Sequence, residues 1–179
     1  MVFAHDTEAA LLAAVELVNS AVPPETLTTV AELDAFFTSH GYTGSRRRDR
    51  AELEEVRALR PRLRELLTSD RDTAAGLVNQ MLLEAGALPR LVRHDGNDWH
   101  IHAIGEDRAL ADRILVETAM AVVDLVRADE LSRLDVCADS DCEGLVLDLS
   151  RNRSRKFCST ACGNRAAVAA YRARQAAEA

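Results

Sequence analysis

The chain has 179 residues, of which 47 % are hydrophobic and 4 % aromatic, and a net charge of −7. This length allows one domain with a substantial core plus a small module. No apolar run approaches the roughly 20 residues of a membrane span, so we expect a soluble, cytoplasmic protein with no membrane partner.

Charge is distributed unevenly along the chain. Residues 1–150 hold 15 Lys and Arg against 28 Asp and Glu, whereas residues 151–179 hold 7 against a single Glu. A uniformly acidic chain would argue against a nucleic-acid partner, but an acidic body with a basic C-terminal segment is typical of a contact module. A solvated basic tail, whose arginines contact nothing specific or the acidic body, is the alternative.

The first residues predict two helices. The first is expected to begin at Asp6 or Thr7, since either side chain can cap it, and to end before Pro23-Pro24. Apolar residues recur at helical spacing within it and should face a core. Thr29-Val-Ala-Glu32 is a capping box, in which the Thr oxygen and the Glu carboxylate satisfy free backbone amides, and it opens the second helix.

A run of three arginines, Arg46 to Arg48, precedes the next helical segment. We interpret it as a solvated loop, with phosphate contact as the alternative. The pattern from Asp49 to Ser69 is helical, but Pro61 must kink or divide it because proline lacks an amide donor and clashes with the preceding turn. A further helix is expected from about Thr73 to Ala85.

The hydrophobic period changes to two between residues 88 and 104, on either side of Asp95-Gly96-Asn97. An Asp-Gly turn between two alternating runs predicts a β-hairpin. Asp107 to Leu131 then forms the longest helical pattern, which leads into a cysteine-rich module near Asp135.

Two histidines fall on one face of the second hairpin strand, His100 and His102. A polar strand face usually meets solvent, and we expect the same here. A ligand pair for a metal or a small acid is the alternative, although the sequence shows no third ligand. Trp99 and Ile101 would point the other way, into the body.

All four cysteines of the chain lie near the C-terminus, as the pairs Cys137/Cys142 and Cys158/Cys162, separated by fifteen residues. Two short pairs at such spacing present four thiolates to one tetrahedral Zn²⁺. Two disulfides are the alternative reading. We disfavour them because the first residues show neither the basic region nor the apolar core of a secretory signal, and a reducing cytosol opposes disulfides.

The module should be a turn, a hairpin and a helix around the metal, a treble-clef-like arrangement. Leu145, Leu147 and Leu149 alternate and predict a strand, and Lys156-Phe157 is expected to be the return strand. Ser159 can cap a final helix reaching to about Arg174, which places the last two ligands at its N-terminus. The positive end of the helix dipole stabilises thiolates there.

These residues resemble a known family. Cys162-Gly163-Asn164-Arg165 spells the signature of the CGNR zinc-finger family, and the pattern around it is similar: an aliphatic run ending in Asp148, then Ser150-Arg151-Asn152 and a basic turn. Members commonly carry a tryptophan where this chain has Phe157, which keeps an aromatic side chain before the third cysteine.

The rest of the chain resembles the helical ABATE domain that accompanies this finger. The matching segments are Leu17-Val18-Asn19, Arg57-Ala58-Leu59-Arg60 and Leu77-Val78-Asn79. The resemblance implies a transcription regulator suggested to respond to stress. The expected fold class is mainly α with a small β-hairpin, in which a helical domain at 1–134 with its hairpin near 88–104 precedes a treble-clef-like zinc finger at 135–179.

The expected zinc is a single structural ion. Four protein thiolates leave no open position for water or substrate, which removes the simplest catalytic reading. The chain also lacks a Gly-rich phosphate loop and a nucleophile elbow, so we expect no enzyme. Asp148 and Asn164 are assigned to structural support: one of Asn164 and Arg165 should brace the finger, and the other should contact a partner or Asp148.

DNA binding is the leading functional interpretation. Phosphates would supply most of the affinity, and arginine is the side chain best able to read guanine in the major groove. The expected nucleic-acid contacts are the basic residues of the turn and the final helix: Arg151, Arg153, Arg155, Lys156, Arg165, Arg172 and Arg174.

The alternative is a zinc-stabilised protein-interaction module without direct DNA binding. Such a basic finger would dock an acidic protein surface, for instance in the transcription machinery. With either interpretation the helical domain would be regulatory or ligand-sensing. A ligand would need a pocket near the hairpin, involving Trp99 or His100.

Overall fold

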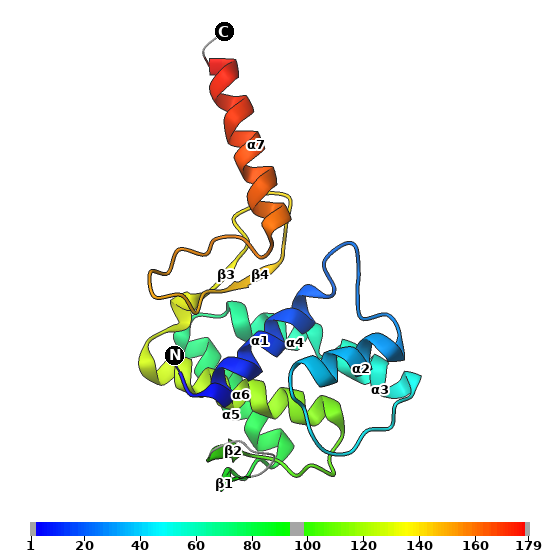
Figure 1. Ribbon diagram of the computed structural model, residues 1–179. Helices are drawn as coiled ribbons and strands as arrows, with labels where there is room; N and C mark the ends of the chain where they lie inside the picture. The colour runs from blue at the N-terminus through cyan, green and yellow to red at the C-terminus, as the bar shows by residue number, and fades with distance from the viewer. Residues whose placement is uncertain (1–2, 94–98, 178–179) are drawn as a thin grey trace.

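The computed structural model describes residues 3–93 and 99–177. A helical body carries one strand pair at each end, and a last helix projects from the finger away from the body (Figure 1). The helices are α1 (His5–Asn19), α2 (Val30–Ser39), α3 (Arg50–Ala58), α4 (Arg60–Thr68), α5 (Arg71–Ala85), α6 (Leu110–Ala128), the short 3-10 helix η1 (Leu131–Arg133) and α7 (Thr160–Ala177). The strands are β1 (Arg90–Val92), β2 (His100–His102), β3 (Leu134–Val136) and β4 (Leu145–Leu147).

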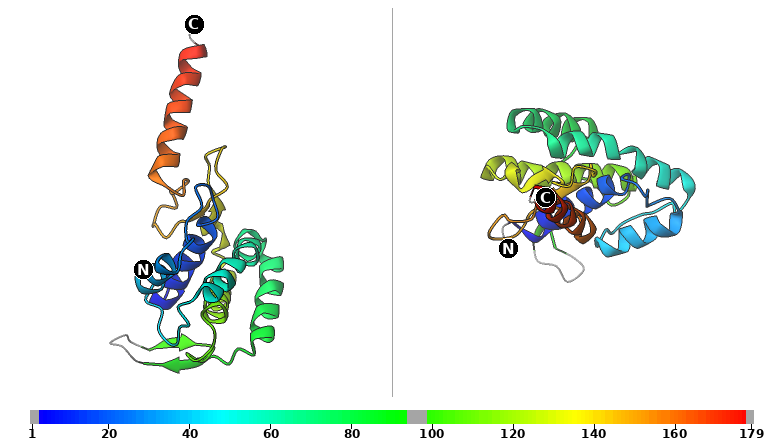
Figure 2. Two further views of the ribbon diagram at one scale, coloured as in Figure 1. Left: turned by 90° about the vertical axis from the view of Figure 1, so that its right-hand side faces the viewer. Right: turned by 90° about the horizontal axis from the view of Figure 1, so that it is seen from above.

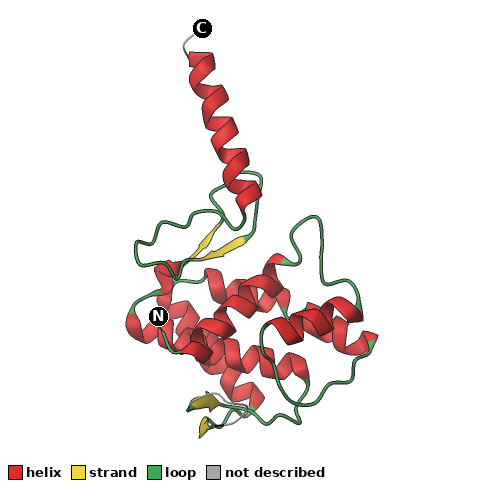
Figure 3. Cartoon of the chain, in the orientation of Figure 1, coloured by secondary structure: helices red, strands yellow, loops and turns green. Residues whose placement is uncertain are grey.

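Helix α6 forms the centre of the body. Seen from above, it lies between α1 and α5, so that both of its flanks are covered (Figure 2). Leu11 and Leu17 of α1, Met81 of α5, and Ile114 and Val122 of α6 are fully buried. Burial of such side chains supplies the main driving force for folding. The expected fold class, mainly α with a small β-hairpin and a C-terminal zinc finger, is confirmed, and the structure has two small antiparallel strand pairs (Figure 3).

Local sequence signals place several helix ends. Thr29 and Glu32 form the expected capping box at the start of α2. Pro61 lies in the first turn of α4 and separates it from α3, as expected of a residue without an amide donor.

The predicted cap of α1 is wrong. Ala4 occupies that position without a side-chain hydrogen bond. Asp6 instead accepts hydrogen bonds from the amides of Thr7 and Ile101, and the Thr7 hydroxyl donates to Asp124. Tertiary contacts therefore use the two side chains that could have capped the helix.

The three-arginine loop is not simply solvated. Only 4 % of the Arg46 side chain is exposed; its guanidinium contacts Glu52 at 2.8 Å and Asp34 at 2.9 Å and lies over the ring of Phe37. Glu52 also accepts the backbone amides of Arg47 and Arg48. The loop is thus folded around one buried carboxylate, a tertiary contact that a run of like charges does not reveal.

The first hairpin forms as expected, with β1 and β2 antiparallel. Its predicted turn, Asp95-Gly96-Asn97, lies outside the described residues. The predicted facing is wrong, because Trp99 and Ile101 are 63 % and 42 % exposed. His100 and His102 instead line a cavity against the body, where α1 and α6 offer polar rather than purely apolar neighbours.

The second strand pair differs from the prediction. The partner of β4 is β3, which precedes the first cysteine, and Lys156-Phe157 is not a strand. All three residues of β4 are buried, because Leu145 and Leu147 join the core of the body while Val146 packs with the cysteines. The division of the chain at residues 134 and 135 stays a prediction; β3 crosses that position.

Glu52 supplies a test of the folded loop. Burial alone would raise the pKa of its carboxyl, but hydrogen bonds from Arg46 and the two amides outweigh this and lower the pKa. We expect Glu52→Ala to lower the free energy of unfolding by about 3 kcal/mol at pH 7, because Arg46 loses a buried partner. Urea denaturation measures this.

The same carboxylate predicts a pH dependence. A group with a lowered folded-state pKa stabilises the protein above its unfolded pKa of about 4.3, and this contribution is lost as the pH falls. The difference between wild type and Glu52→Ala should therefore shrink toward pH 3. As a control, Glu65→Ala on the exposed face of α4 should change stability by less than about 0.5 kcal/mol. Equal effects of the two substitutions would refute the account.

Candidate metal centre

The four cysteines converge from three segments. Cys137 and Cys142 lie in the connection between β3 and β4. Cys158 follows the basic loop, which comprises residues 150–157, and Cys162 is in the first turn of α7. Their Sγ atoms all lie within 4.8 Å of one another, with Cys142 and Cys158 at 3.5 Å and Cys158 and Cys162 at 3.6 Å. Zn–S bonds of about 2.3 Å in a tetrahedron place sulfurs about 3.8 Å apart. The donor set thus fits one structural zinc ion.

Backbone and side-chain donors surround the sulfurs. The amides of Gly144 and Cys158 approach the Sγ of Cys142 and Cys137 at 3.3 and 3.4 Å, and the Ser159 hydroxyl approaches Cys162 Sγ at 3.3 Å. A Cβ added at Gly144 would lie 2.9 Å from Cys158 Sγ, so glycine is needed for this close approach. Ser159 also accepts the amide of Cys162, which confirms its predicted place as the cap of α7.

Two of the four thiols resist ionisation in the absence of a cation. Burial, followed by the neighbouring thiols, raises the pKa of Cys158 to about 12, and burial raises the pKa of Cys142. The hydroxyl of Ser159 lowers the pKa of Cys162. Four negative sulfurs at these distances repel one another, so Zn²⁺ must displace the remaining protons as it binds. Folding of the finger and metal binding are thereby coupled.

Arg165 of the signature braces the finger. Its Nε donates to Asp139 at 2.9 Å and its terminal nitrogen donates to Cys162 Sγ at 3.0 Å. Asp139 is buried, and desolvation is outweighed by Arg165 and the Asp141 amide, so that the pKa of Asp139 is lowered. Such contacts to a ligand orient it and tune the metal. Asn164 is exposed, with no hydrogen bond of its side chain among the described residues.

The Asp148 carboxylate contacts the basic loop, and in the described structure it contacts neither Asn164 nor Arg165. It accepts the amides of Ser150 at 2.8 Å and Arg155 at 2.7 Å, and the Ser150 side chain, followed by these two amides, lowers the pKa of this carboxyl group. Arg133, which the sequence did not single out, donates to the carbonyls of Asp148 and Ser150. The loop is thereby tied to the end of α6 through η1.

The seven predicted nucleic-acid contacts fall into two groups. Three make contacts within the protein: Arg153 pairs with Glu130, Arg155 donates to backbone carbonyls of the finger, and Arg165 contacts Asp139. In the described part of the chain, the other four side chains have neither a hydrogen bond nor an ion pair. They are Arg151, Lys156, Arg172 and Arg174, and all are exposed.

Besides Arg133, a second residue that the sequence did not single out attaches the finger to the body. The Asn19 side chain donates to the Leu145 carbonyl at 2.9 Å and accepts the Leu145 amide at 2.6 Å. The Asn19 side-chain amide thus pairs with the backbone of β4 in the way that a residue of a neighbouring strand would. The only sequence signal was indirect, because Asn19 belongs to the Leu17-Val18-Asn19 segment.

Comparisons with known proteins agree with this architecture. Residues 12–129 match the family model named ABATE, described as "Putative stress-induced transcription regulator", and residues 133–175 match the model of the CGNR zinc finger. Neither description is that of an enzyme. None of the curated proteins matches the chain. Across the described residues, no helix combines the length and apolarity that crossing a membrane requires.

Metal substitution tests the donor set. The purified chain should hold one zinc per molecule, measured by native mass spectrometry, since one group of four sulfurs converges. Replacement by Co²⁺ should give the intense visible absorption of a tetrahedral thiolate complex, with one ion per chain. Weak absorption typical of an octahedral ion, or a stoichiometry of two, would contradict this geometry.

Removal of the bracing arginine tests its role. Arg165→Ala should weaken zinc binding by about tenfold, the lower end of the loss expected when a group holding a ligand is deleted. Competition with a chromophoric chelator measures the affinity. Arg172→Ala, on the same helix but without a contact to the centre, should leave zinc affinity unchanged. An unaltered affinity for Arg165→Ala would assign this side chain to a partner instead.

Proposed function

Because this chain belongs to the ABATE family and carries a CGNR zinc finger, we propose that it regulates transcription by binding DNA through α7 and the adjoining basic loop. The helical body would be the regulatory part. The observation that carries the proposal is the position of α7, which leaves the zinc centre and extends away from the body (Figure 1, Figure 2).

Helix α7 is shaped for a groove rather than for a protein core. It has 18 residues, about 27 Å at 1.5 Å per residue, and only Cys162 within it is buried. Alanine and arginine, which dominate it, are strong helix formers, so the helix needs little packing to form. The major groove of DNA, about 12 Å wide, admits one such helix.

The distribution of charge along the chain also favours an orientation in which α7 faces the DNA. The segment beyond residue 150 carries seven basic residues against one Glu, while the remainder is acidic. Phosphates would attract the finger and repel the body, which points α7 toward the nucleic acid. Arg172 and Arg174 on α7, with Arg151 and Lys156 on the loop, are the charges not used within the described structure. We assign the DNA contacts to these four.

The remaining three arginines would act indirectly. Arg153 and Arg155 hold the loop, and Arg165 holds the metal centre, through contacts within the protein. Their removal should disturb binding by altering the finger. This division separates residues that position the finger from residues that contact DNA.

A protein-docking role has one observation in its favour. Val168 and Tyr171 on α7 are 49 % and 57 % exposed, and Val168 shares a helix face with Arg172. Apolar side chains on a projecting helix can anchor a partner protein. The test of DNA binding below also separates this alternative.

The DNA proposal predicts a strong salt dependence. Zinc-loaded protein should bind a labelled mixed-sequence duplex, measured by fluorescence anisotropy, and binding should weaken steeply between about 50 and 200 mM salt. The double substitution Arg172→Gln and Arg174→Gln should lower affinity by at least about tenfold and reduce the salt slope by about 2, because two phosphate contacts are lost. Chelation of zinc should abolish binding.

A matched control removes equal charge elsewhere. Arg50→Gln with Arg90→Gln alters two exposed arginines of the body and should change neither affinity nor slope appreciably. Zinc content is measured for each variant, so that loss of the finger is not mistaken for loss of contact. Absence of binding even at low salt, with zinc present, would refute the proposal and favour protein docking through α7.

A further inference from the structure

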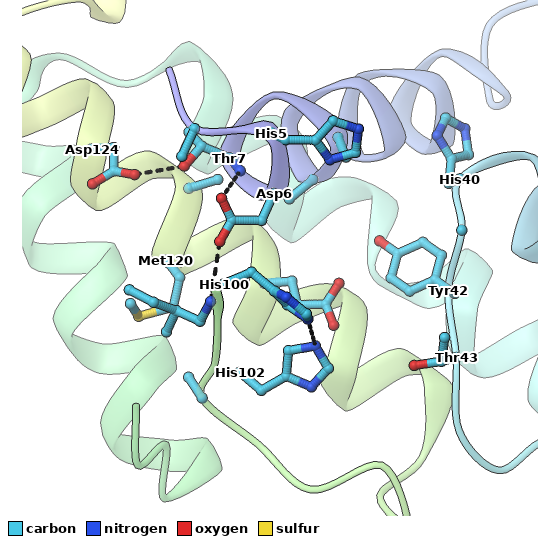
Figure 4. A pocket seen from close by; sticks show the side chains of 18 of the residues that line it. His5, Asp6, Thr7, His40, Tyr42, Thr43, His100, His102, Met120 and Asp124 are labelled. Carbon is cyan, nitrogen blue, oxygen red and sulfur yellow. Dashed lines mark hydrogen bonds between the residues drawn. The ribbon is translucent and has the colours of Figure 1, made fainter. Parts of the chain in front are cut away.

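A cavity of about 390 Å³ lies at the end of the body opposite the finger. Its walls come from the start of α1, the loop after α2, strand β2 and the middle of α6 (Figure 4). Four of the five histidines of the chain line it, together with three carboxylates. This volume falls within the range of sites that bury a small organic molecule.

Part of the wall is held by its own hydrogen bonds. Asp6 accepts the amides of Thr7 and Ile101, and Asp124 accepts the Thr7 hydroxyl at 2.6 Å. These contacts tie β2 and α6 to the first turn of α1 (Figure 4). These polar groups hold the wall of the cavity in place, so few of their hydrogen-bonding positions are left for a ligand.

Two other polar groups of the wall, one buried and one partly buried, have no hydrogen bond within the described part of the chain. The Tyr42 hydroxyl is buried and has no hydrogen-bond partner among the described residues, and its side chain is directed into the cavity (Figure 4). Within the described ranges, the Glu117 carboxylate has neither a hydrogen bond nor an ion pair. The charge of Arg113 acts on this carboxylate, but its guanidinium donates to the Ser45 carbonyl. A buried polar group without a partner is costly unless a ligand or water satisfies it.

The charged residues that line the cavity favour a positively charged ligand. No Lys or Arg is among the described residues that line the cavity, whereas Asp6, Glu117 and Asp124 are. Burial raises the pKa of Glu117 to about 7; Arg113 opposes this shift and Asp6 adds to it. Since no ion pair of Glu117 exists in the described part of the chain, a cationic ligand would provide its counter-ion.

Apolar and aromatic side chains complete the wall. Met120 and the partly exposed Trp99 and Ile101 also line the cavity. They offer contact area for a hydrocarbon and a ring face for a cation. A bare metal ion is a poorer fit, because the cysteine cluster is the only convergence of three ligating side chains in the described part of the chain.

We propose that this cavity binds a small organic ammonium compound, with the charged nitrogen at Glu117 and the Tyr42 hydroxyl, and the hydrocarbon against Trp99 and Met120. A regulatory role for this compound rests on the role proposed above for the helical body. The binding itself does not require that the finger contact DNA.

The test compares three compounds with one hydrocarbon frame: 2-phenylethylamine, 2-phenylethanol and 3-phenylpropionate. Trp99 is the only tryptophan and lines the cavity, so its fluorescence reports binding to the full, zinc-loaded chain. At pH 8, where Glu117 is mostly ionised, the amine should bind at least about tenfold more tightly than the alcohol or the acid. No saturable change with the amine, or equal affinity for the alcohol, would overturn the proposal.

Two variants locate the charged nitrogen. Glu117→Gln should weaken amine binding by about tenfold and leave the alcohol unaffected, because only the charge is removed. Glu65→Gln, on the exposed surface of α4, is the charge-matched control and should bind as wild type. Unchanged amine binding by Glu117→Gln would overturn the assignment.

Tyr42→Phe provides a second variant that keeps the fold, since it deletes only a hydroxyl that has no partner among the described residues. It should also weaken amine binding while preserving the thermal unfolding transition. These titrations contain no DNA, so their failure would leave the DNA proposal standing. Loss of DNA binding in the α7 variant would likewise leave the cavity proposal untouched.

Discussion

The convergence of four thiols on one point is the constraint on which the functional end of the molecule depends. The connection between β3 and β4, the basic loop and the first turn of α7 meet there, and their sulfurs lie within 4.8 Å. Burial raises the pKa of the Cys158 and Cys142 thiols, so a bound cation that takes all four cysteines as thiolates stabilises this arrangement. Helix α7 begins at this centre and buries only Cys162, which makes its direction a consequence of metal binding.

The finger is also fixed to the body by polar contacts. Asn19, at the end of α1, holds the backbone of β4, and Arg133, just beyond α6, holds the basic loop. The other end of α1 and the middle of α6 line the cavity. The same two helices therefore reach both the proposed ligand site and the proposed DNA-binding element.

Sequence patterns predicted those features that depend on neighbours along the chain. Periodicity and Pro61 predicted the helices, the Thr29 box and Ser159 predicted two caps, and cysteine spacing predicted the metal centre. Features that depend on distant contacts were missed or wrong. Examples are the buried Arg46, the outward Trp99 and the partner of β4, since each is decided by what another element presents. The charge run beyond residue 150 likewise did not reveal which arginines are used internally.

The most direct test of the central claim maps the DNA contact residue by residue. Amide chemical shifts of the ¹⁵N-labelled, zinc-loaded chain are followed as a short duplex is added at low salt, about 50 mM. The account predicts that changes concentrate in the loop around Arg151 and Lys156 and in α7 beyond Arg165, with the helical body unaltered apart from its junction with the finger. Changes confined to the body, or none at all, would contradict the claim that α7 is the DNA-binding element.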